Sequence, residues 1–263
     1  MVKFVFERLE KRLKELGKIA VAFSGGIDSS FLLFSANEVL GKENVLAIIG
    51  NGQMIPRKDY KEAIEFLKEN DFEFREIPVD CLEVLEFREN HKDRCYYCKK
   101  SIMTRIKQVA KENGFDIVCD GKNVDDTKGY RPGQKATKEL GIVSPLEECG
   151  FTKKDIRENA KSLGITFWDK PSNSCLATRF PYNTELTNES LKRVELAEEL
   201  IKDLDIPTTR VRSHGDIARI EVQKEYFDRI LGNDRLVNDI KKLGFEYVTL
   251  DLEGMKSGRF DKK

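Results

Sequence analysis

Glycine, serine and aspartate residues stand together in the stretch SGGIDSS, residues 24–30. An apolar run at 19–23 precedes it and predicts a buried strand, and an apolar helix towards residue 40 is predicted after it. A glycine turn between a strand and a helix N-terminus suits a phosphate, because the first backbone N–H groups of a helix have no partner within it. The expected phosphate-binding residues are the glycines and serines of this stretch, Gly25, Gly26, Ser24, Ser29 and Ser30.

The stretch belongs to neither of two common phosphate-binding motifs. It is shorter than a Walker A loop and has no lysine before Ser29, and it does not read GxGxxG. A serine-capped helix that follows a glycine turn and binds nothing is the alternative interpretation.

Acidic residues follow a second predicted strand, at 117–119. Asp125 and Asp126 are expected at the same edge of a parallel sheet as the glycine loop, where carboxylates suit Mg²⁺ that also binds phosphate oxygens. A solvated acidic loop is the alternative. Arg131, in the RPG stretch that follows, is expected to pair with a phosphate or a carboxylate.

Three of the six cysteines have spacing or surroundings that suggest chemistry. Cys95 and Cys98 form a CxxC pair just before a helix predicted to end near residue 113, and Cys175 lies in a polar loop. The pair suits half of a zinc site, part of an iron–sulfur site, a redox pair or two structural cysteines. With Cys175 there are three thiols, one short of a four-cysteine site. Cys81 and Cys119 are expected to be plain or core cysteines.

Alternating strands and helices in the first half predict a doubly wound, parallel α/β sheet. Ligands of such sheets bind beyond the carboxyl ends of the strands, where the glycine loop and the acidic residues are expected. The predicted strands are 19–23, 44–49, 72–79 and 117–119, with a further short strand ending at 143–146 and a helix at 57–70.

The second half predicts a smaller α+β domain with an antiparallel sheet. Its expected elements are a helix at 187–204, strands at 208–212 and 217–222, a helix at 224–243 and a strand at 245–250. Arg210 and Arg212 alternate along one strand and therefore share a face, which suits a phosphate or is simply a solvated edge. The expected divisions are a first domain at 1–170, a cysteine-bearing linker at 171–186 and a second domain at 187–263.

Composition bounds the classes of partner. The 263 residues carry 46 basic and 46 acidic side chains, so no basic excess indicates nucleic acid or a membrane surface. No signal peptide or membrane span is evident, and the expected location is the cytoplasm, where cysteines favour metal binding or catalysis over disulfides.

Seven stretches in order resemble the LarE-type sulfur transferases, a group of PP-loop ATP pyrophosphatases. They are SGGIDS, RCYYCK at 94–99, GKNVDD at 121–126, RPG, SPL, WDKPSNSCLATRFPY and RVR…ARIE at 210–221. The resemblance covers nearly the whole chain. It implies that ATP and Mg²⁺ serve to adenylate a carboxylate of pyridinium-3,5-biscarboxylic acid mononucleotide, a small nucleotide substrate, and that sulfur then replaces oxygen in nickel-pincer nucleotide biosynthesis.

The resemblance also implies how the sulfur is supplied. Some members give up the sulfur of a cysteine that matches Cys175, and others hold a 4Fe-4S cluster on three cysteines. This chain resembles the second kind, with Cys95, Cys98 and Cys175 as cluster ligands. Two departures, Thr178 where serine is usual and Asn183 where glycine is usual, put the local loop shape in doubt.

Further roles follow from the resemblance alone. Asp126 would hold Mg²⁺, Arg210 and Arg212 would bind substrate, and the chain would form a homo-oligomer. Catalytic roles fall to Cys175, Asp28, Glu198 and Glu221. Two alternatives of other kinds stay open: a tRNA thiolase of the same superfamily, and a non-catalytic nucleotide- or zinc-binding module.

Overall fold

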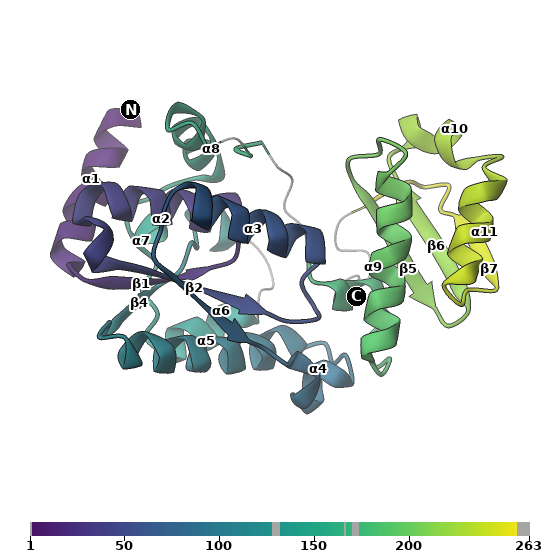
Figure 1. Cartoon of the computed structure of the whole chain (residues 1–263), viewed down its shortest axis with the longest axis horizontal. Helices are drawn as coiled ribbons and strands as arrows, with labels where there is room; N and C mark the ends of the chain where they lie inside the picture. Colours follow the sequence, from purple (N-terminus) through teal and green to yellow (C-terminus); the bar gives the residue numbers. More distant parts are fainter. Residues whose placement is uncertain (1, 128–131, 166, 170–173, 257–263) are drawn as a thin grey trace. The chain divides into compact units, whose positions relative to one another are not determined.

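The computed structural model describes residues 2–127, 132–165, 167–169 and 174–256, and side chains from residue 6 onwards within these ranges. Arg131, one of the expected phosphate-binding residues, lies outside the described residues. The chain forms two compact units (Figure 1). The first contains residues 1–52, 57–80 and 95–172, and the second contains residues 53–56, 81–94 and 173–263.

The first unit is built on a four-stranded sheet of order β3-β2-β1-β4, in which every neighbouring pair is parallel. This confirms the predicted parallel sheet. Strand β1 is buried along its whole length, as expected for a central strand with helices on both faces. The strands are β1 (Ile19–Phe23), β2 (Val45–Asn51), β3 (Phe74–Pro78) and β4 (Ile117–Cys119).

Helices cover both faces of this sheet (Figure 1). One face packs against α1 (Val2–Leu16), α2 (Ile27–Leu40), α3 (Arg57–Glu69) and α8 (Lys153–Ser162), which share one core. Helix α2 is buried on nearly every side, since Phe31, Leu32 and Leu33 are all inaccessible to solvent. Helix α5 (Arg94–Glu112) lies on the opposite face, and α6 (Gly133–Glu139) and α7 (Pro145–Glu148) complete the unit.

The strand expected at 143–146 is reduced to a single bridge. Val143 pairs with Cys119, and α7 begins two residues later at Pro145. Proline suits the first position of a helix because its missing N–H would have no partner there. The prediction of a strand was therefore wrong beyond the one bridge.

The second unit holds a three-stranded sheet of order β5-β6-β7. Strands β5 (Thr209–His214) and β6 (Ile217–Val222) are antiparallel, but β6 and β7 (Tyr247–Leu250) are parallel, so the expectation of a purely antiparallel sheet was wrong. A parallel pair needs a crossover connection, which α10 (Phe227–Ile230) and α11 (Asp234–Lys242) provide. The single helix expected at 224–243 is broken around Gly232, which has a positive φ of 71°.

Two short segments from the first half of the chain belong to the second unit. The Asn90 side chain donates to the carbonyls of Phe180 and Pro181, and the Leu176 N–H donates to the Met54 carbonyl at 3.0 Å. The unit also contains α4 (Leu85–Arg88) and α9 (Asn188–Lys202). These contacts brace residues 176–181 directly beside Cys175.

Among the described residues, no helix is both long enough and apolar enough to cross a bilayer.

Candidate functional site

The glycine loop follows β1 and leads into α2, as predicted. Gly25 has a positive φ of 72°, and a Cβ at this position would lie 2.5 Å from the Cβ of Ala63 in α3. The Ser29 hydroxyl lies inside the loop, where it accepts from the Ser24 N–H at 3.2 Å and donates to the Gly26 carbonyl at 3.0 Å. The loop is therefore a close-packed turn whose shape depends on the missing side chain at Gly25.

The first turn of α2 has polar atoms with no protein partner. Gly26 precedes the helix and gives it no side-chain cap. Within the described part of the chain, Ser30 Oγ and Asp28 Oδ1 are buried and have no hydrogen-bond partner. Buried polar atoms of this kind normally bind a ligand or water, and the helix N-terminus adds partial positive charge. The arrangement fits the phosphates of ATP.

The acidic residues expected at this edge do lie beside the glycine loop. Asp28 Oδ2 pairs with Lys153 Nζ at 2.6 Å, and the Lys153 N–H donates to Asp125 Oδ2 at 2.9 Å. Gly121 lets the loop after β4 approach, because a Cβ there would lie 2.7 Å from the Ser29 nitrogen. Burial raises the pKa of the Asp28 carboxyl above its ordinary value, and Lys153 partly opposes that shift.

Asp126 lies in the turn at Val124–Thr127, next to Asp125. Its carboxylate accepts from the Asn123 N–H at 3.2 Å, and its charge acts on Asp28. In the described ranges, no three His, Cys, Asp or Glu side chains gather as a ready metal site. A Mg²⁺ ion at this edge would thus depend on phosphate oxygens for part of its coordination, which is usual for this ion.

The six cysteines fall into two groups by exposure. Cys95 and Cys98 lie in the first turn of α5, not before the helix as expected, and their spacing of three places them on one side of it. Cys95 is exposed, and Cys98 and Cys175 are half-buried. The other three, Cys81, Cys119 and Cys149, are buried. Burial raises the pKa of the Cys119 and Cys149 thiols, so less thiolate forms at these two and they should react more slowly with electrophiles than exposed cysteines.

Cys175 immediately precedes a short turn, Leu176–Arg179, that one buried arginine holds in place. The Arg179 guanidinium, with no exposed surface, donates from Nη1 to the carbonyl and hydroxyl of Ser174, at 3.0 and 2.7 Å, and to the Cys175 carbonyl at 3.3 Å. Its other nitrogens make a bidentate pair with Glu198, at 2.7 and 2.9 Å. Glu198 also accepts from the Val211 N–H at 3.0 Å, which ties the turn to β5.

A second buried pair supports the same turn. Arg212 donates to Glu221 Oε2 at 3.1 and 3.0 Å, and its Nη1 donates to the Thr178 carbonyl at 2.5 Å. Arg219 donates to the other oxygen of Glu221 at 2.9 Å. Two of the residues expected at the substrate site, Arg212 and Glu221, are therefore occupied with each other and with the cysteine-bearing turn.

Arg210 differs from Arg212. Within the described ranges, the one hydrogen bond of its side chain goes from Nη1 to the Thr209 carbonyl, at 2.7 Å, and no carboxylate forms an ion pair with it. Burial lowers the pKa of the Arg210 guanidinium to about 10, and the charge of Arg179 acts in the same direction. A partly buried cation without a carboxylate is suited to an anionic ligand.

The two departures from the family pattern fit the turn. Thr178 donates its hydroxyl to the Cys175 carbonyl at 2.7 Å, as a serine would. Asn183 has a positive φ of 61°, a conformation that glycine adopts freely and asparagine tolerates better than most residues.

Lys153 was not predicted to be a site residue, and no buried ion pair was predicted for Arg179. Arg179 is the one charged residue in the otherwise uncharged stretch LATRF, which was the available signal for a buried ion pair. Lys153 lies in the first turn of α8, where Thr152 and Asp155 form a capping box.

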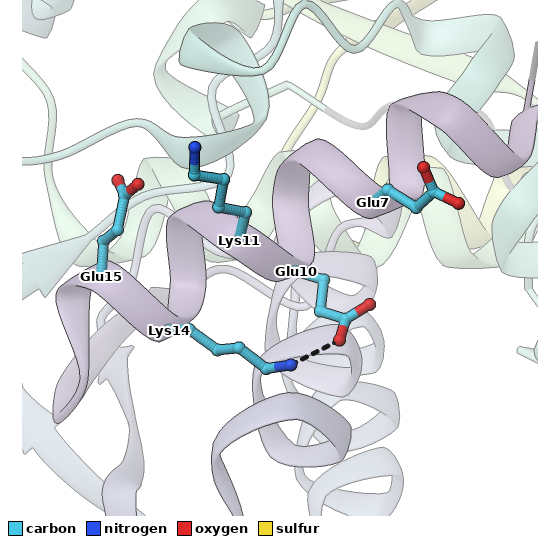
Figure 2. A pocket seen from close by; sticks show the side chains of 5 residues that line it. All are labelled: Glu7, Glu10, Lys11, Lys14 and Glu15. Carbon is cyan, nitrogen blue, oxygen red and sulfur yellow. Dashed lines mark hydrogen bonds and ion pairs between the residues drawn. The ribbon is translucent and has the colours of Figure 1, made fainter.

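A surface hollow lies along α1 (Figure 2). Acidic and basic side chains of that helix alone line it, and Lys14 pairs there with Glu10 at 2.6 Å. It contains none of the predicted site residues.

A methyl group at Gly25 should disrupt the phosphate loop. We expect Gly25→Ala to lower ATP binding by more than about tenfold and to destabilise the chain by about 1–3 kcal/mol, through strain and the contact with Ala63. Urea unfolding and nucleotide titration measure the two effects.

Gly17→Ala is the matched control, because Gly17 has a similar φ of 70° but a Cβ added there would meet open space. Gly17→Ala should destabilise the chain by about 1–2 kcal/mol through backbone strain only, and it should leave ATP binding unchanged. Equal effects of the two substitutions on ATP binding would contradict the close-packed loop.

Thiol reactivity should separate the two groups of cysteines. In the folded, metal-free chain at pH 8, iodoacetamide should modify Cys95, Cys98 and Cys175 more than about tenfold faster than Cys119 and Cys149. Peptide mass mapping gives the rates, and the urea-unfolded chain, where all six should react alike, is the control. Fast modification of Cys119 in the folded chain would refute this division.

The Arg179–Glu198 pair should show strong non-additivity. We expect Arg179→Met to cost about 3–5 kcal/mol because it leaves Glu198 buried without a counter-charge. Adding Glu198→Gln, which keeps an acceptor for Val211, should restore part of that loss. Urea unfolding followed by circular dichroism measures all four chains of the cycle.

The exposed Arg235–Asp239 pair in the same unit is the control for this cycle. Its coupling should stay below about 1 kcal/mol. Simple additivity at Arg179 and Glu198 would count against the buried brace.

Comparison with known proteins identifies the family. The NAD synthase family model matches residues 1–113. The chain is 40% identical over 250 residues to pyridinium-3,5-bisthiocarboxylic acid mononucleotide synthase of Lactiplantibacillus plantarum, covering 95% of this chain and 91% of that protein. It is 34% identical to a Synechocystis sp. protein over 100% of this chain and 98% of that one, and 29% identical to argininosuccinate synthase of Pyrococcus furiosus over 58% and 40%. The chain belongs to the LarE-type sulfur transferases, ATP-dependent enzymes of the PP-loop ATP pyrophosphatase family.

Proposed function

We propose that this enzyme adenylates a carboxylate of pyridinium-3,5-biscarboxylic acid mononucleotide with ATP and then replaces the activated oxygen by sulfur. The name of the Lactiplantibacillus plantarum relative supports the substrate. The observation that carries the proposal is the turn that bears Cys175, because two buried arginines hold its backbone in place while Cys175 itself stays partly exposed.

The adenylation step uses the glycine loop. A carboxylate oxygen of the substrate attacks the α-phosphorus of ATP, the bond to the bridging oxygen breaks, and pyrophosphate leaves with the electron pair. The N–H groups at the start of α2, together with Ser24, Ser29 and Ser30, bind the phosphates. Asp126, with Asp28 and Asp125 beside it, would hold Mg²⁺, which neutralises phosphate charge when bound.

The sulfur step belongs to Cys95, Cys98 and Cys175. Cys95, Cys98 and Cys175 are more exposed than the other three cysteines, which are buried, and this exposure supports their proposed role as ligands of a 4Fe-4S cluster that leaves one iron without a protein ligand. When bound, such a cluster would supply a labile sulfide to the activated carbonyl carbon, and AMP would leave with the former carboxylate oxygen and the electron pair of the broken C–O bond. The alternative is that Cys175 gives up its own sulfur.

The two arginines of β5 take different roles in this proposal. Arg210, which has no carboxylate partner within the described part of the chain, binds the phosphate of the substrate. Arg212 positions the cysteine-bearing turn through the Thr178 carbonyl. Glu198 and Glu221 are saturated by arginines, so their role is to fix those arginines rather than to exchange protons with the substrate.

Metal and sulfide analysis of anaerobically purified protein tests the sulfur source. We expect about four iron and four acid-labile sulfide per chain, with both falling sharply in Cys95→Ala. Cys149→Ala, at a buried cysteine, should keep both and serves as the matched control. Zinc or no metal would contradict the cluster, and conversion of Cys175 to dehydroalanine after one turnover would establish the alternative.

Pyrophosphate release tests the adenylation step separately. Release should require both ATP and the biscarboxylic mononucleotide, and transfer RNA should not replace the mononucleotide. Release that depends on transfer RNA instead would support a tRNA thiolase.

A further inference from the structure

Helix α8 carries four basic residues, of which Lys153 and Arg157 share one side of the helix. Lys153 is its first residue and Arg157 lies four residues further on, so both side chains project from the same side of the helix. Helix α8 packs against α2, whose N-terminus follows the glycine loop. The two basic residues therefore belong to the same face of the first unit as the phosphate-binding turn.

Lys153 is bound to the acidic residues of this edge. Its ammonium pairs with Asp28 Oδ2 at 2.6 Å, while Asp28 Oδ1 is buried without a hydrogen-bond partner in the part of the chain that the structure describes. The ion pair thus satisfies only one of the two carboxylate oxygens. A bound phosphate with its cation would offer a partner to each group: an anion to Lys153 and a cation to Asp28.

The Arg157 side chain differs from that of Lys153. It is half-buried, it makes no hydrogen bond or ion pair within the described ranges, and its Nε is buried without an acceptor. Its positive charge nevertheless acts on Asp28, which places it within electrostatic reach of the loop. A guanidinium held partly out of water with an unsatisfied N–H is unfavourable unless it binds an anion, and its planar fork matches phosphate oxygens.

We propose that Lys153 and Arg157 form a pyrophosphate clamp opposite the glycine loop, binding the β- and γ-phosphates of ATP. The clamp rests on the proposed adenylation. As the substrate oxygen bonds to the α-phosphorus, the bridging oxygen takes the electron pair and departs with pyrophosphate. The clamp stabilises the charge that develops on that leaving group, and both residues are positioning groups for its oxygens.

Calorimetric titration of the full chain with pyrophosphate and Mg²⁺, and separately with AMP, tests the clamp. We expect Arg157→Ala to weaken pyrophosphate binding by about tenfold or more and to leave AMP binding within about twofold, because AMP lacks the β- and γ-phosphates. Arg157→Lys should recover part of the loss. Since Arg157 makes no ion pair in the described ranges, its removal should leave the unfolding midpoint unchanged.

Lys154→Ala is the matched control, because Lys154 neighbours Lys153 on the same helix but is 82% exposed and faces Glu158 at 3.8 Å. It should bind both ligands as the unchanged chain does. Lys153→Ala should weaken pyrophosphate binding as Arg157→Ala does, and its unfolding midpoint shows whether the unpaired Asp28 also disturbs the fold.

Two results distinguish failure of the clamp from failure of the proposed function. Unchanged pyrophosphate affinity in a folded Arg157→Ala chain would overturn the clamp and leave adenylation standing. If the unmodified chain binds neither pyrophosphate nor AMP in the presence of Mg²⁺, both proposals fall.

Discussion

The ion pair between Arg179 and Glu198 determines the shape of the second unit around Cys175. Both side chains are almost wholly removed from water, with 0% and 2% of their surfaces exposed. Charges buried in this way are tolerated only when each is fully paired and hydrogen-bonded. The arginine has one set of partners that achieves this: the carboxylate on α9 and the carbonyl groups around Cys175. Glu198 also accepts a hydrogen bond from the backbone of β5, so moving the turn would separate Arg179 from Glu198 and leave a buried charge without a partner.

The first unit fixes its loop by a different means. There two glycines allow close packing, because they have no Cβ. Ala63 packs against Gly25, and the backbone at Ser29 packs against Gly121. Close packing therefore sets the backbone of the phosphate loop, and the Ser29 hydroxyl holds it from inside. Steric packing thus shapes the glycine loop of the first unit, and a buried ion pair shapes the cysteine-bearing turn of the second.

Local sequence patterns predicted the elements whose formation depends on residues close in the sequence, such as strands and the glycine loop. The buried runs at 19–23 and 44–49 predicted central parallel strands, and SGGIDS predicted the loop between β1 and α2. The parallel pairing of β7, the break at Gly232 and the start of α5 at Arg94 were missed. Lys153 was not predicted as a site residue because its partner Asp28 is 125 residues away in the sequence. Helical and strand periodicities relate only residues that are close in the sequence, so they cannot predict such a contact.

The chain passes several times between its two units, and this limits how one unit can be exchanged between related enzymes. The backbone passes from one unit to the other at 52/53, 56/57, 80/81, 94/95 and 172/173. A cassette of residues 173–263 would omit Asn90, whose amide binds the carbonyls of Phe180 and Pro181, and Met54, whose carbonyl binds Leu176. A single splice would consequently transfer the sulfur-bearing turn without its braces. Modular exchange between relatives must carry three separate segments together, which favours inheritance of the two units as one piece.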